Sequence, residues 1–427
     1  ICFDDAALAA NRGYFIPLDE YINADVMPNL TKAIEEDPKM RAICTDVDGH
    51  IYGLPKKEPV RPTVSNQVFI NKKWLDNLNL SMPTTIDEFY NVLKAFKKQD
   101  ANGNGDPNDE IPYAAGYTDI VTAFILPFGV VDKDGLSPTS LKVVNGAPIF
   151  NPITKEYKEG LKFMNKCFQE GLVDNEIFTQ DGSMVNAKLQ NAETAIVGVS
   201  SGWTQDAVFG VHSNEYVAMD ALAGPSGEKY VFSGQAGYQY ARNELMITTS
   251  CKDPETLLRW ADQFYTEDAS IQTLYGSFDL AVKKNDDGTY LVLDPPEGES
   301  ADTFAWVNSL RDFGPKYVPD GFNDKVSFES AASGDGLKME LSKAVEYAAK
   351  PELAFPDVIY TTEQLDQLAT LGADIGSYVT SMRAKWVSEG GIDEEWDSYI
   401  EELNRMGLET YMQIHTDAYN TYKASMN

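Results

Sequence analysis

Residues 67–96 read QVFINKKWLDNLNLSMPTTIDEFYNVLKAF and join a short apolar strand to an amphipathic helix. Gln67–Ile70 is the strand candidate. Thr85 and Glu88 have the spacing of a capping box, in which the hydroxyl and the carboxylate satisfy the first free amides of the helix. Four apolar side chains then fall on one helical face: Phe89, Val92, Leu93 and Phe96. A strand followed by such a helix is typical of an α/β protein.

The same alternation continues along the chain. Further strand candidates are Ala195–Val199, Glu244–Thr248 and a hairpin built on Asn285–Gly288. Asp253 and Pro254 begin another helix, with proline at the first helical position, where its missing amide hydrogen costs nothing. We therefore predict the α/β class for most of the chain.

The C-terminal region is predicted to be entirely helical. Thr362 caps a long helix that runs to about Trp386, Asp393 begins a second helix, and a third follows Gly407. The aromatic residues on these helices recur at helical spacing, which is typical of a buried face.

Size and charge limit the possible functions. A chain of 427 residues suits two or three domains. A formal net charge of −31 argues against nucleic-acid binding, which needs clustered lysine and arginine, and it also disfavours docking on anionic lipid. No stretch approaches about 18 consecutive apolar residues, so no membrane span is predicted. We interpret the acidic surface as a device for solubility.

The four cysteines and the first residues say little about the compartment. Cys2, Cys44, Cys167 and Cys251 are unevenly spaced, and their even number permits two disulfides without implying them. The chain opens at Ile1 in what resembles the middle of a strand. We therefore expect that a preceding segment, with any export signal, is missing from this sequence.

The segment DANGNGDPNDE has the layout of a calcium loop that follows a helix. Oxygen-bearing side chains alternate along it, and Gly105 stands at the sixth position. The candidate ligands are Asp100, Asn102, Asn104, Asp106 (through its carbonyl), Asn108, Asp109 and Glu110. Position twelve, where an EF-hand needs a bidentate glutamate, is Ile111, and no amphipathic helix follows. The pattern predicts one structural calcium site, and the alternative is a glycine-rich polar turn without metal.

Evidence for catalysis is sparse. Gly198–Gly202 matches GxSxG after a strand, with Ser200 as the nucleophile, and His415 lies downstream. His415, however, falls within an amphipathic helix, and no HGGG motif is present. No metal-ligand spacing surrounds the other histidines, and no phosphate-binding glycine loop occurs. A glycosidase pair of carboxylates cannot be selected among 66 acidic residues. We predict that the protein is not an enzyme.

Aromatic residues in loop-like surroundings are the ligand-binding candidates. Trp203 directly follows a predicted strand, where ligands of open α/β sheets gather. The others lie near glycine-rich or proline-containing breaks, and an arginine follows two of them. Flat aromatic faces suit the apolar C–H faces of pyranose rings. The candidates are Trp203, Trp306, Tyr238, Tyr240, Tyr275, Phe278 and Arg242.

Several motifs, in order, resemble one family across nearly the whole chain. Residues 48–55 read DGHIYGLP where that family has DGKIYGLP, and residues 71–76 read NKKWLD where it has RKDWLD. The calcium-loop segment follows, and residues 392–396 read IDEEW near the end. The chain thus resembles the large lipoprotein-type extracellular solute-binding proteins (family 1) of Gram-positive ABC sugar importers, which are related to alginate- and oligosaccharide-binding proteins.

The resemblance implies a two-lobe, periplasmic-binding-protein-like fold with a hinge and a helical C-terminal region. The expected first lobe contains residues 1–113 and 240–311, and the second contains 114–239 and 312–427. The implied function is capture of an oligosaccharide between the lobes for import by an ABC transporter. The implied partners are this ligand and the permease subunits, and we expect a monomer on the cell surface, held by a lipid anchor that is not present in this sequence.

The resemblance also supports calcium at Asp100, Asn102, Asn104, Asp109 and Glu110, in a loop one residue longer than the family's usual pattern. Asn71 stands where the family usually has arginine, and no lipobox context precedes Cys2.

Two other functions remain open at this stage, namely a secreted glycan hydrolase and a calcium-dependent glycan adhesin. The charge of the sugar also stays open. Basic side chains would serve an acidic sugar if they line the cleft, and a neutral glycan follows if they do not. These side chains are Lys56, Lys57, Arg61, Arg242 and Arg311. Because most surface lysines and arginines are simply solvated, we favour a neutral glycan.

Overall fold

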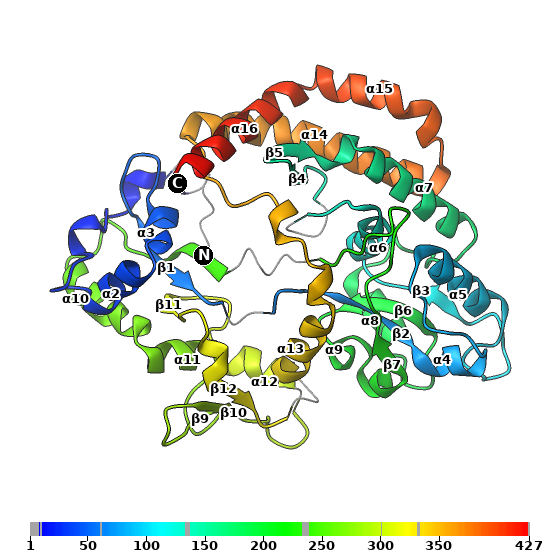
Figure 1. Cartoon of the computed structure of the whole chain (residues 1–427), viewed down its shortest axis with the longest axis horizontal. Helices are drawn as coiled ribbons and strands as arrows, with labels where there is room; N and C mark the ends of the chain where they lie inside the picture. Colours follow the sequence, from blue (N-terminus) through cyan, green and yellow to red (C-terminus); the bar gives the residue numbers. More distant parts are fainter. Residues whose placement is uncertain are drawn as a thin grey trace.

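The computed structural model describes residue 8 and residues 11–59, 62–132, 137–232, 239–299, 301–330 and 334–425. Figure 1 shows two lobes of helices and small sheets, with long helices arching over them. The predicted α/β class, the two lobes and the helical C-terminal region are confirmed.

The first lobe is built on the sheet β11-β1-β8. Strand β1 (Gly53–Lys57) lies between β11 (Lys316–Tyr317), which is parallel to it, and β8 (Tyr240–Met246), which is antiparallel. Leu30, Leu54 and other apolar side chains form its core. The helices around this sheet are α2 (Pro28–Glu36), α3 (Lys39–Cys44) and α10 (Pro254–Ala261).

A smaller sheet extends the first lobe. The hairpin predicted at Asn285–Gly288 is confirmed: β9 (Val282–Lys284) and β10 (Tyr290–Val292) pair antiparallel, and β12 (Val326–Phe328) adds parallel to β10. Helices α11 (Glu267–Tyr275) and α12 (Ala301–Asn308) lie next to this sheet in Figure 1.

The second lobe is built on the sheet β3-β6-β2-β7. Its strands are β2 (Gln67–Asn71), β3 (Ile111–Tyr113), β6 (Val197–Gly202) and β7 (Tyr216–Ala218). A separate hairpin consists of β4 (Leu141–Val144) and β5 (Ala147–Phe150). The helices of this lobe are α4 (Lys72–Asn77), α5 (Ile86–Lys98), α6 (Tyr117–Ile125), α7 (Lys155–Gln169), α8 (Gly182–Leu189) and α9 (Gln205–Phe209). The predicted capping box of α5 is present, with Thr85 and Glu88 bonded reciprocally.

The C-terminal helices complete the core of the second lobe. Trp386 of α14 and Tyr399 of α15 are buried in one cluster with Phe96 of α5 and Tyr113 of β3. The capping residue of α14 is Thr361, one position before the predicted Thr362, because its hydroxyl accepts from the amide of Gln364. The helices are α13 (Gly334–Val345), α14 (Thr362–Glu389), α15 (Ile392–Arg405) and α16 (Leu408–Ser425).

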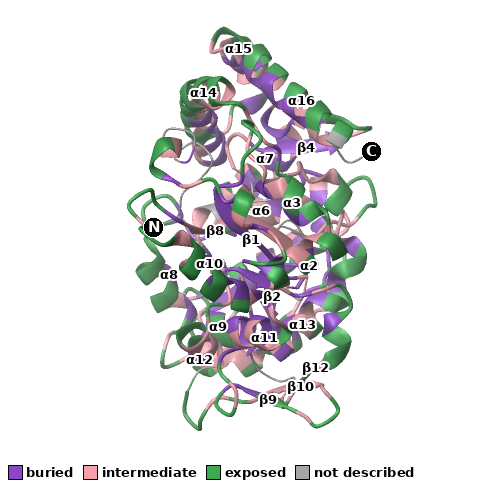
Figure 2. Ribbon diagram, turned by 90° about the vertical axis from the view of Figure 1, so that its left-hand side faces the viewer, coloured by how far each residue is buried: buried purple, intermediate pink, exposed green. Residues whose placement is uncertain are grey.

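Short 3-10 helices join the larger elements at Arg12–Tyr14, Asp19–Tyr21, Leu126–Phe128, Asn151–Ile153, Gly210–Glu215, Asp262–Tyr265, Phe322–Lys325, Glu346–Ala348 and Pro351–Leu353. Figure 2 shows the buried residues along the strands and the exposed residues on the outer helical faces. None of the described helices is long and apolar enough to cross a membrane.

Sheet pairing groups the chain differently from the expected lobe boundaries. Strands β2 and β3, which lie within the expected first-lobe range 1–113, pair with β6 in one sheet. Strand β11, which lies after residue 311, pairs with β1. The expected lobes were already discontinuous, but their boundaries did not anticipate that β2 and β3 pair with β6 or that β11 pairs with β1, because pairing between distant strands leaves no local mark in the sequence.

The described cysteines Cys44, Cys167 and Cys251 are free thiols, and Cys2 lies outside the described residues. Burial raises the pKa of the Cys44 and Cys167 thiols to about 12, so both stay protonated at neutral pH.

Candidate functional site

The two main sheets present their carboxyl edges to each other. In the second lobe, β3 and β6 run parallel, and β2 runs antiparallel to both β6 and β7. The carboxyl ends of β3, β6 and β7 therefore share an edge with the start of β2. The segment after β1 enters this edge at β2, and the segment after β7 returns to β8 beside the carboxyl end of β1. Ligands of open α/β sheets bind outside such edges.

A hollow of about 800 Å³, open to solvent, lies at this edge of the second lobe. Its polar lining comes from the start of β2, from α6, from the end of β6 and from the segment after β7. Val345 of α13 also reaches it. The polar lining residues are Asn66, Gln67, Asp119, Thr122, Ser201, Asp220 and Tyr230, and no lysine or arginine is among the described residues that line it.

Two carboxylates give this hollow its charge. Asp119, in the first turn of α6, has no hydrogen-bond or ion-pair partner among the described residues. Surrounding protein atoms raise its pKa by desolvation, although the residue keeps an exposed surface. Asp220 accepts from Lys229 Nζ at 2.7 Å and from the Tyr347 hydroxyl at 2.6 Å. Asp119 is thus the acceptor that remains available to a ligand.

The facing edge of the first lobe carries a lysine between two tyrosines. Lys57 Nζ lies 5.5 Å from the ring centroid of Tyr240 and 5.8 Å from that of Tyr317. It donates to Asp37 Oδ2 at 2.6 Å, and the Tyr240 hydroxyl donates to the same oxygen at 2.6 Å. Burial alone would raise the pKa of Asp37, but these two hydrogen bonds lower it below its ordinary value. Both tyrosine rings are half-buried.

The predicted ligand residues lie in several places. Trp203 follows β6 at the carboxyl edge of the second lobe, as its position after a strand predicted, and Tyr240 lies at the facing edge of the first lobe. Arg242, two residues along β8, donates to the Ile43 carbonyl at 3.3 Å and lines a separate hollow with Cys44 and Tyr360. Tyr238 lies outside the described residues.

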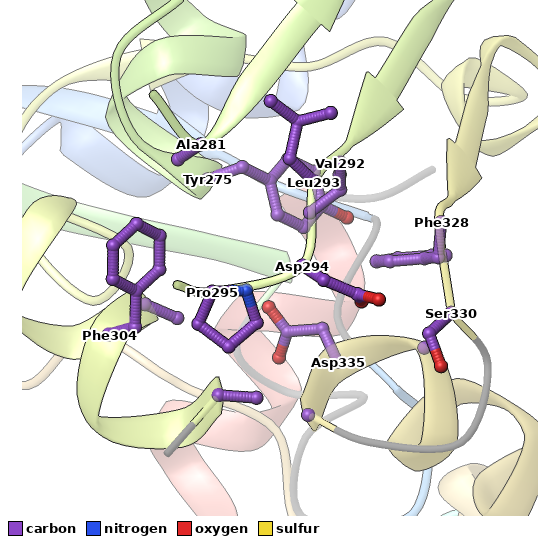
Figure 3. A pocket seen from close by; sticks show the side chains of 14 residues that line it. Tyr275, Ala281, Val292, Leu293, Asp294, Pro295, Phe304, Phe328, Ser330 and Asp335 are labelled. Atoms are coloured by element: carbon purple, nitrogen blue, oxygen red, sulfur yellow. The ribbon is translucent and has the colours of Figure 1, made fainter. Parts of the chain in front are cut away.

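Tyr275 and Phe278 pack into the core of the smaller sheet. Phe278 stacks on Tyr290 with the ring planes 1° apart, and Tyr275 is 7% exposed. Tyr275 also lines a hollow of about 450 Å³ between β10 and α12 (Figure 3), and Asp294 and Asp335 are among the residues that line it. Trp306 is 57% exposed on α12, with its ring edge-on to Phe313.

The basic residues that could have served an acidic sugar are mostly occupied. Lys56 Nζ lies 3.4 Å from both Glu58 and Glu244, and Lys57 pairs with Asp37. Arg311 pairs with Asp335. Arg242 lines a separate hollow, as described above, and Arg61 lies outside the described residues.

The calcium-loop segment lies at the opposite edge of the second lobe, between α5 and the start of β3. Asp100 accepts from the amides of Gly103, Asn104 and Gly105. The side-chain amides of Asn102 and Asn104 both donate to Asp109, at 3.1 and 2.6 Å. The segment is therefore folded around its own side chains. Strand β3 follows it, in agreement with the expectation that no amphipathic helix follows.

Glu110 closes this loop from the protein interior. Its Oε1 accepts from the Ala101 amide at 2.7 Å, whereas its buried Oε2 has no hydrogen-bond partner. Burial raises the pKa of Glu110, and the charge of Asp109 adds to the shift. Asp106 instead accepts from Asn108. In the described part of the chain, no three His, Cys, Asp or Glu side chains gather as a metal site, so the donor set here depends on the asparagine amides.

The serine and the histidine of the possible hydrolase motif lie on different elements of the fold. Ser200 is buried within β6, opposite Phe69 of β2. His415 of α16 shares a hydrogen bond of 2.6 Å with the Tyr360 hydroxyl and is surrounded by aromatic rings. Burial lowers the pKa of His415 to about 4. This histidine has an aromatic packing role.

Sequence reasoning missed several residues at the two edges. Asp119, Gln67 and Tyr317 are polar or aromatic residues inside ordinary helix and strand patterns, and nothing in their spacing marks them. A positional signal was available only for Asn66, which immediately precedes the predicted strand, and for Gln67, which is the first residue of that strand. Their role depends on β2 running opposite to its neighbours, which cannot be read from the sequence.

The fold and the facing edges define a solute-binding protein, and comparison with known families agrees. The model of the bacterial extracellular solute-binding protein family matches residues 3–271, and the chain belongs to this family.

Individual relatives cover nearly the whole chain. The fructooligosaccharide ABC transporter substrate-binding protein FusA of Streptococcus pneumoniae is 34% identical over 98% of this chain and 78% of its own length. Its structure with kestose superposes with a TM-score of 0.83 at 31% identity, covering 99% of this chain and 87% of that one. An HMO-binding solute-binding protein of Bifidobacterium longum infantis gives a TM-score of 0.80 at 29% identity, over 98% and 86%.

A third relative is named for different polysaccharides. The polygalacturonan/rhamnogalacturonan-binding protein YtcQ of Bacillus subtilis is 26% identical over 97% of this chain and 78% of its own length. The alginate-binding protein AlgQ2 shares the periplasmic-binding-protein-like fold, with a TM-score of 0.69 over 97% of this chain and 84% of that one, at 19% identity.

Proposed function

We propose that this protein captures a neutral oligosaccharide between its two lobes and delivers it to the permease of an ABC transporter. The observation that carries the proposal is the pair of facing carboxyl edges. One has the hollow that Asp119 lines and Trp203 directly after β6, and the other has Tyr240 and Tyr317 around Lys57. Both edges offer aromatic faces and side chains that accept hydrogen bonds from sugar hydroxyl groups, and this combination suits a glycan. The relatives that bind oligosaccharides support it.

The lobes would close on the ligand by a hinge movement. We propose residues 11–59 and 239–330 as the first lobe, and 62–232 and 334–425 as the second, because this division keeps each sheet in one lobe. Closure would create the surface that binds the permease. We further propose that the protein acts at the cell surface as a lipid-anchored monomer, which the extracellular family and a related lipoprotein of Bacillus subtilis support.

The lining of the hollow supports a neutral ligand. Asp119 and Asp220 would repel a uronate carboxylate. The described lysines and arginines considered for such a ligand are paired with acids or, for Arg242, line a separate hollow. A hydroxyl group, in contrast, donates well to a free carboxylate.

Calorimetric titration with kestose, with the sugar then checked by mass spectrometry, tests the proposal. We expect saturable one-to-one binding at micromolar affinity or tighter, which corresponds to at least about 8 kcal/mol, and an unchanged sugar. Trigalacturonate should not compete. Release of shorter sugars would instead indicate a hydrolase, and multivalent binding abolished by chelation would indicate an adhesin. A peptide that raises the melting temperature when no oligosaccharide does would overturn the sugar assignment.

Asp119 is expected to contribute directly to affinity. Replacing it by alanine should weaken kestose binding about 10- to 100-fold, since a hydrogen bond to a charged acceptor contributes about 1.5–3 kcal/mol. Asp417→Ala, on the exposed face of α16, is the matched control and should leave the affinity unchanged. Equal kestose affinities of the two variants would show that Asp119 does not contact the ligand.

We also propose that the loop between α5 and β3 binds one structural Ca²⁺. The donor set fits a hard cation: the side chains of Asn102, Asn104 and Asp109 converge, and Glu110 offers a buried oxygen without a partner. The two ends of an asparagine amide exchange places by rotation, so these amides can turn their oxygens inward. A FusA structure described as an EF-hand mutant supports this assignment by analogy.

Calcium should stabilise the protein without contacting the sugar. The loop lies at the amino end of β3, whereas the hollow lies at the opposite edge of the same sheet, where β3 and β6 end. At free calcium 100 times the Kd, the expected gain in unfolding free energy is about 2.7 kcal/mol, measured by calorimetric melting. Asp109→Ala should lose this gain. Asp106→Ala should keep it, because the main-chain carbonyl of residue 106 is retained. Chelation should change the kestose Kd by less than about threefold.

A further inference from the structure

Helix α13 lies against the second lobe next to two of the three places where the chain passes between the lobes. The amide of Val64, shortly after the first of these places, donates to Ser342 Oγ at 3.0 Å. The amide of Val231, just before the second of them, donates to the Ala348 carbonyl just beyond the helix, at 3.2 Å. Within the helix, Lys338 has no exposed surface (0%). A buried lysine is uncommon, because removing an ammonium from water is costly unless it is well bonded.

The Lys338 ammonium contacts three groups at the carboxyl edge of the second lobe. It donates to the Ser65 carbonyl and, at 3.2 Å, to Gln67 Oε1. Its Nζ also lies 4.8 Å from the ring centroid of Trp203. These three contacts come from the segment before β2, from β2 and from the end of β6.

The same lysine determines the orientation of Gln67. The other end of that amide, Nε2, donates to the Leu341 carbonyl at 2.9 Å, one turn further along α13. Because an ammonium can only donate and a carbonyl can only accept, the two contacts leave one orientation for the amide. Gln67 lines the hollow described above, so its orientation is part of the candidate site.

The ammonium is not neutralised by an acid. Among the described residues, no carboxylate forms an ion pair with Lys338, and burial lowers its pKa to about 7. The charged and titratable groups that face it line a small hollow with it: Asp335 on its own helix, and Arg311 and Tyr275 from the first lobe. Asp335 and Arg311 are paired with each other and contribute little net charge.

We propose that Lys338 is a positioning residue of the candidate site, whose ammonium holds the Trp203 ring and the Gln67 amide and whose loss of a proton weakens glycan binding. A neutral amine keeps N–H donors for the two oxygens but loses the charge that attracts the aromatic face. Loss of the proton is therefore expected to affect Trp203 more than Gln67. The effect on glycan affinity rests on the proposed function, whereas the effect on the Trp203 ring does not.

The first experiment follows Trp203 in the free protein. The difference in tryptophan emission between the natural protein and Trp203→Phe isolates this ring. It should show one transition near pH 7, where Lys338 loses its proton. Lys338→Met should lack the transition, and Lys343→Met, an exposed lysine on the same helix, should retain it. A Trp203 signal that does not change between about pH 5.5 and pH 9 in the natural protein overturns the inference, even if Lys338→Met fails to fold.

The second experiment measures the kestose Kd at two pH values. We expect about tenfold weaker binding at about pH 9 than at about pH 6 in the natural protein and in Lys343→Met. Lys338→Met should bind weakly at both values, with no dependence on pH. Full affinity of Lys338→Met at both values would overturn the positioning role. If kestose binds none of the proteins while the Trp203 transition is present, the proposed function fails for this probe and the positioning role stands.

Discussion

Replacement of Trp203 by alanine should weaken kestose binding by about 30-fold. A sugar ring stacked on an indole buries on the order of 80 Å² of apolar surface, which is worth about 2 kcal/mol. Trp203 stands directly after β6, at the carboxyl edge of the second-lobe sheet, and the Lys338 ammonium lies over its ring. No other tryptophan lies at the carboxyl edge of either main sheet in the described part of the chain, so no neighbour replaces its flat face.

Two further variants separate stacking from general damage. Trp203→Phe keeps an aromatic face and should lose only about threefold in affinity. Trp260→Ala removes an indole that is exposed on the first lobe and should bind kestose as the natural protein does. Calorimetric titration measures all three variants. An unaltered Kd in Trp203→Ala would show that the sugar lies elsewhere, and Trp306 would then be the next tryptophan to test.

Replacement of Trp386 by alanine should lower the free energy of unfolding by about 3–5 kcal/mol. Trp386 is 1% exposed on α14 and packs against Trp396 and Tyr399 of α15. Its indole N–H donates to Glu395 at 3.0 Å. The substitution would leave a large cavity where the C-terminal helices meet the core of the second lobe.

Denaturant unfolding followed by circular dichroism measures this change. Trp260→Ala serves again as the control and should change the free energy of unfolding by less than about 1 kcal/mol, because its indole is mostly in solvent. A small effect in Trp386→Ala would mean that the C-terminal helices contribute little to the stability of the second lobe, contrary to the shared core.

Binding and stability thus depend on different parts of the second lobe. The carboxyl edge of its sheet carries the hollow, and the opposite edge carries the predicted calcium loop. The C-terminal helices complete the core on which both depend. Variants of Trp203 or Asp119 should therefore change affinity with little change in melting temperature, whereas variants of Asp109 or Trp386 should do the reverse.

Local features could be predicted from the sequence because short-range interactions determine them. The capping box at Thr85 and Glu88, the proline-started helix α10 and the turn at Asn285–Gly288 all depend on atoms a few residues apart. The ends of the strands were predicted less accurately. Strand β6 runs to Gly202, beyond the apolar residues that marked it, because Gln67 pairs with Gly202.

The sequence by itself determined the class of this protein: its ordered motifs, its acidic composition and its helical C-terminal region sufficed for the family, and Trp203 could be selected from its place after a strand. Only the tertiary structure decided which residues share a site. The antiparallel course of β2 brings Gln67 to the same edge as Trp203, and α13 brings Lys338 there from the far end of the chain. Such contacts depend on pairing and packing between distant segments, which leave no local pattern in the sequence.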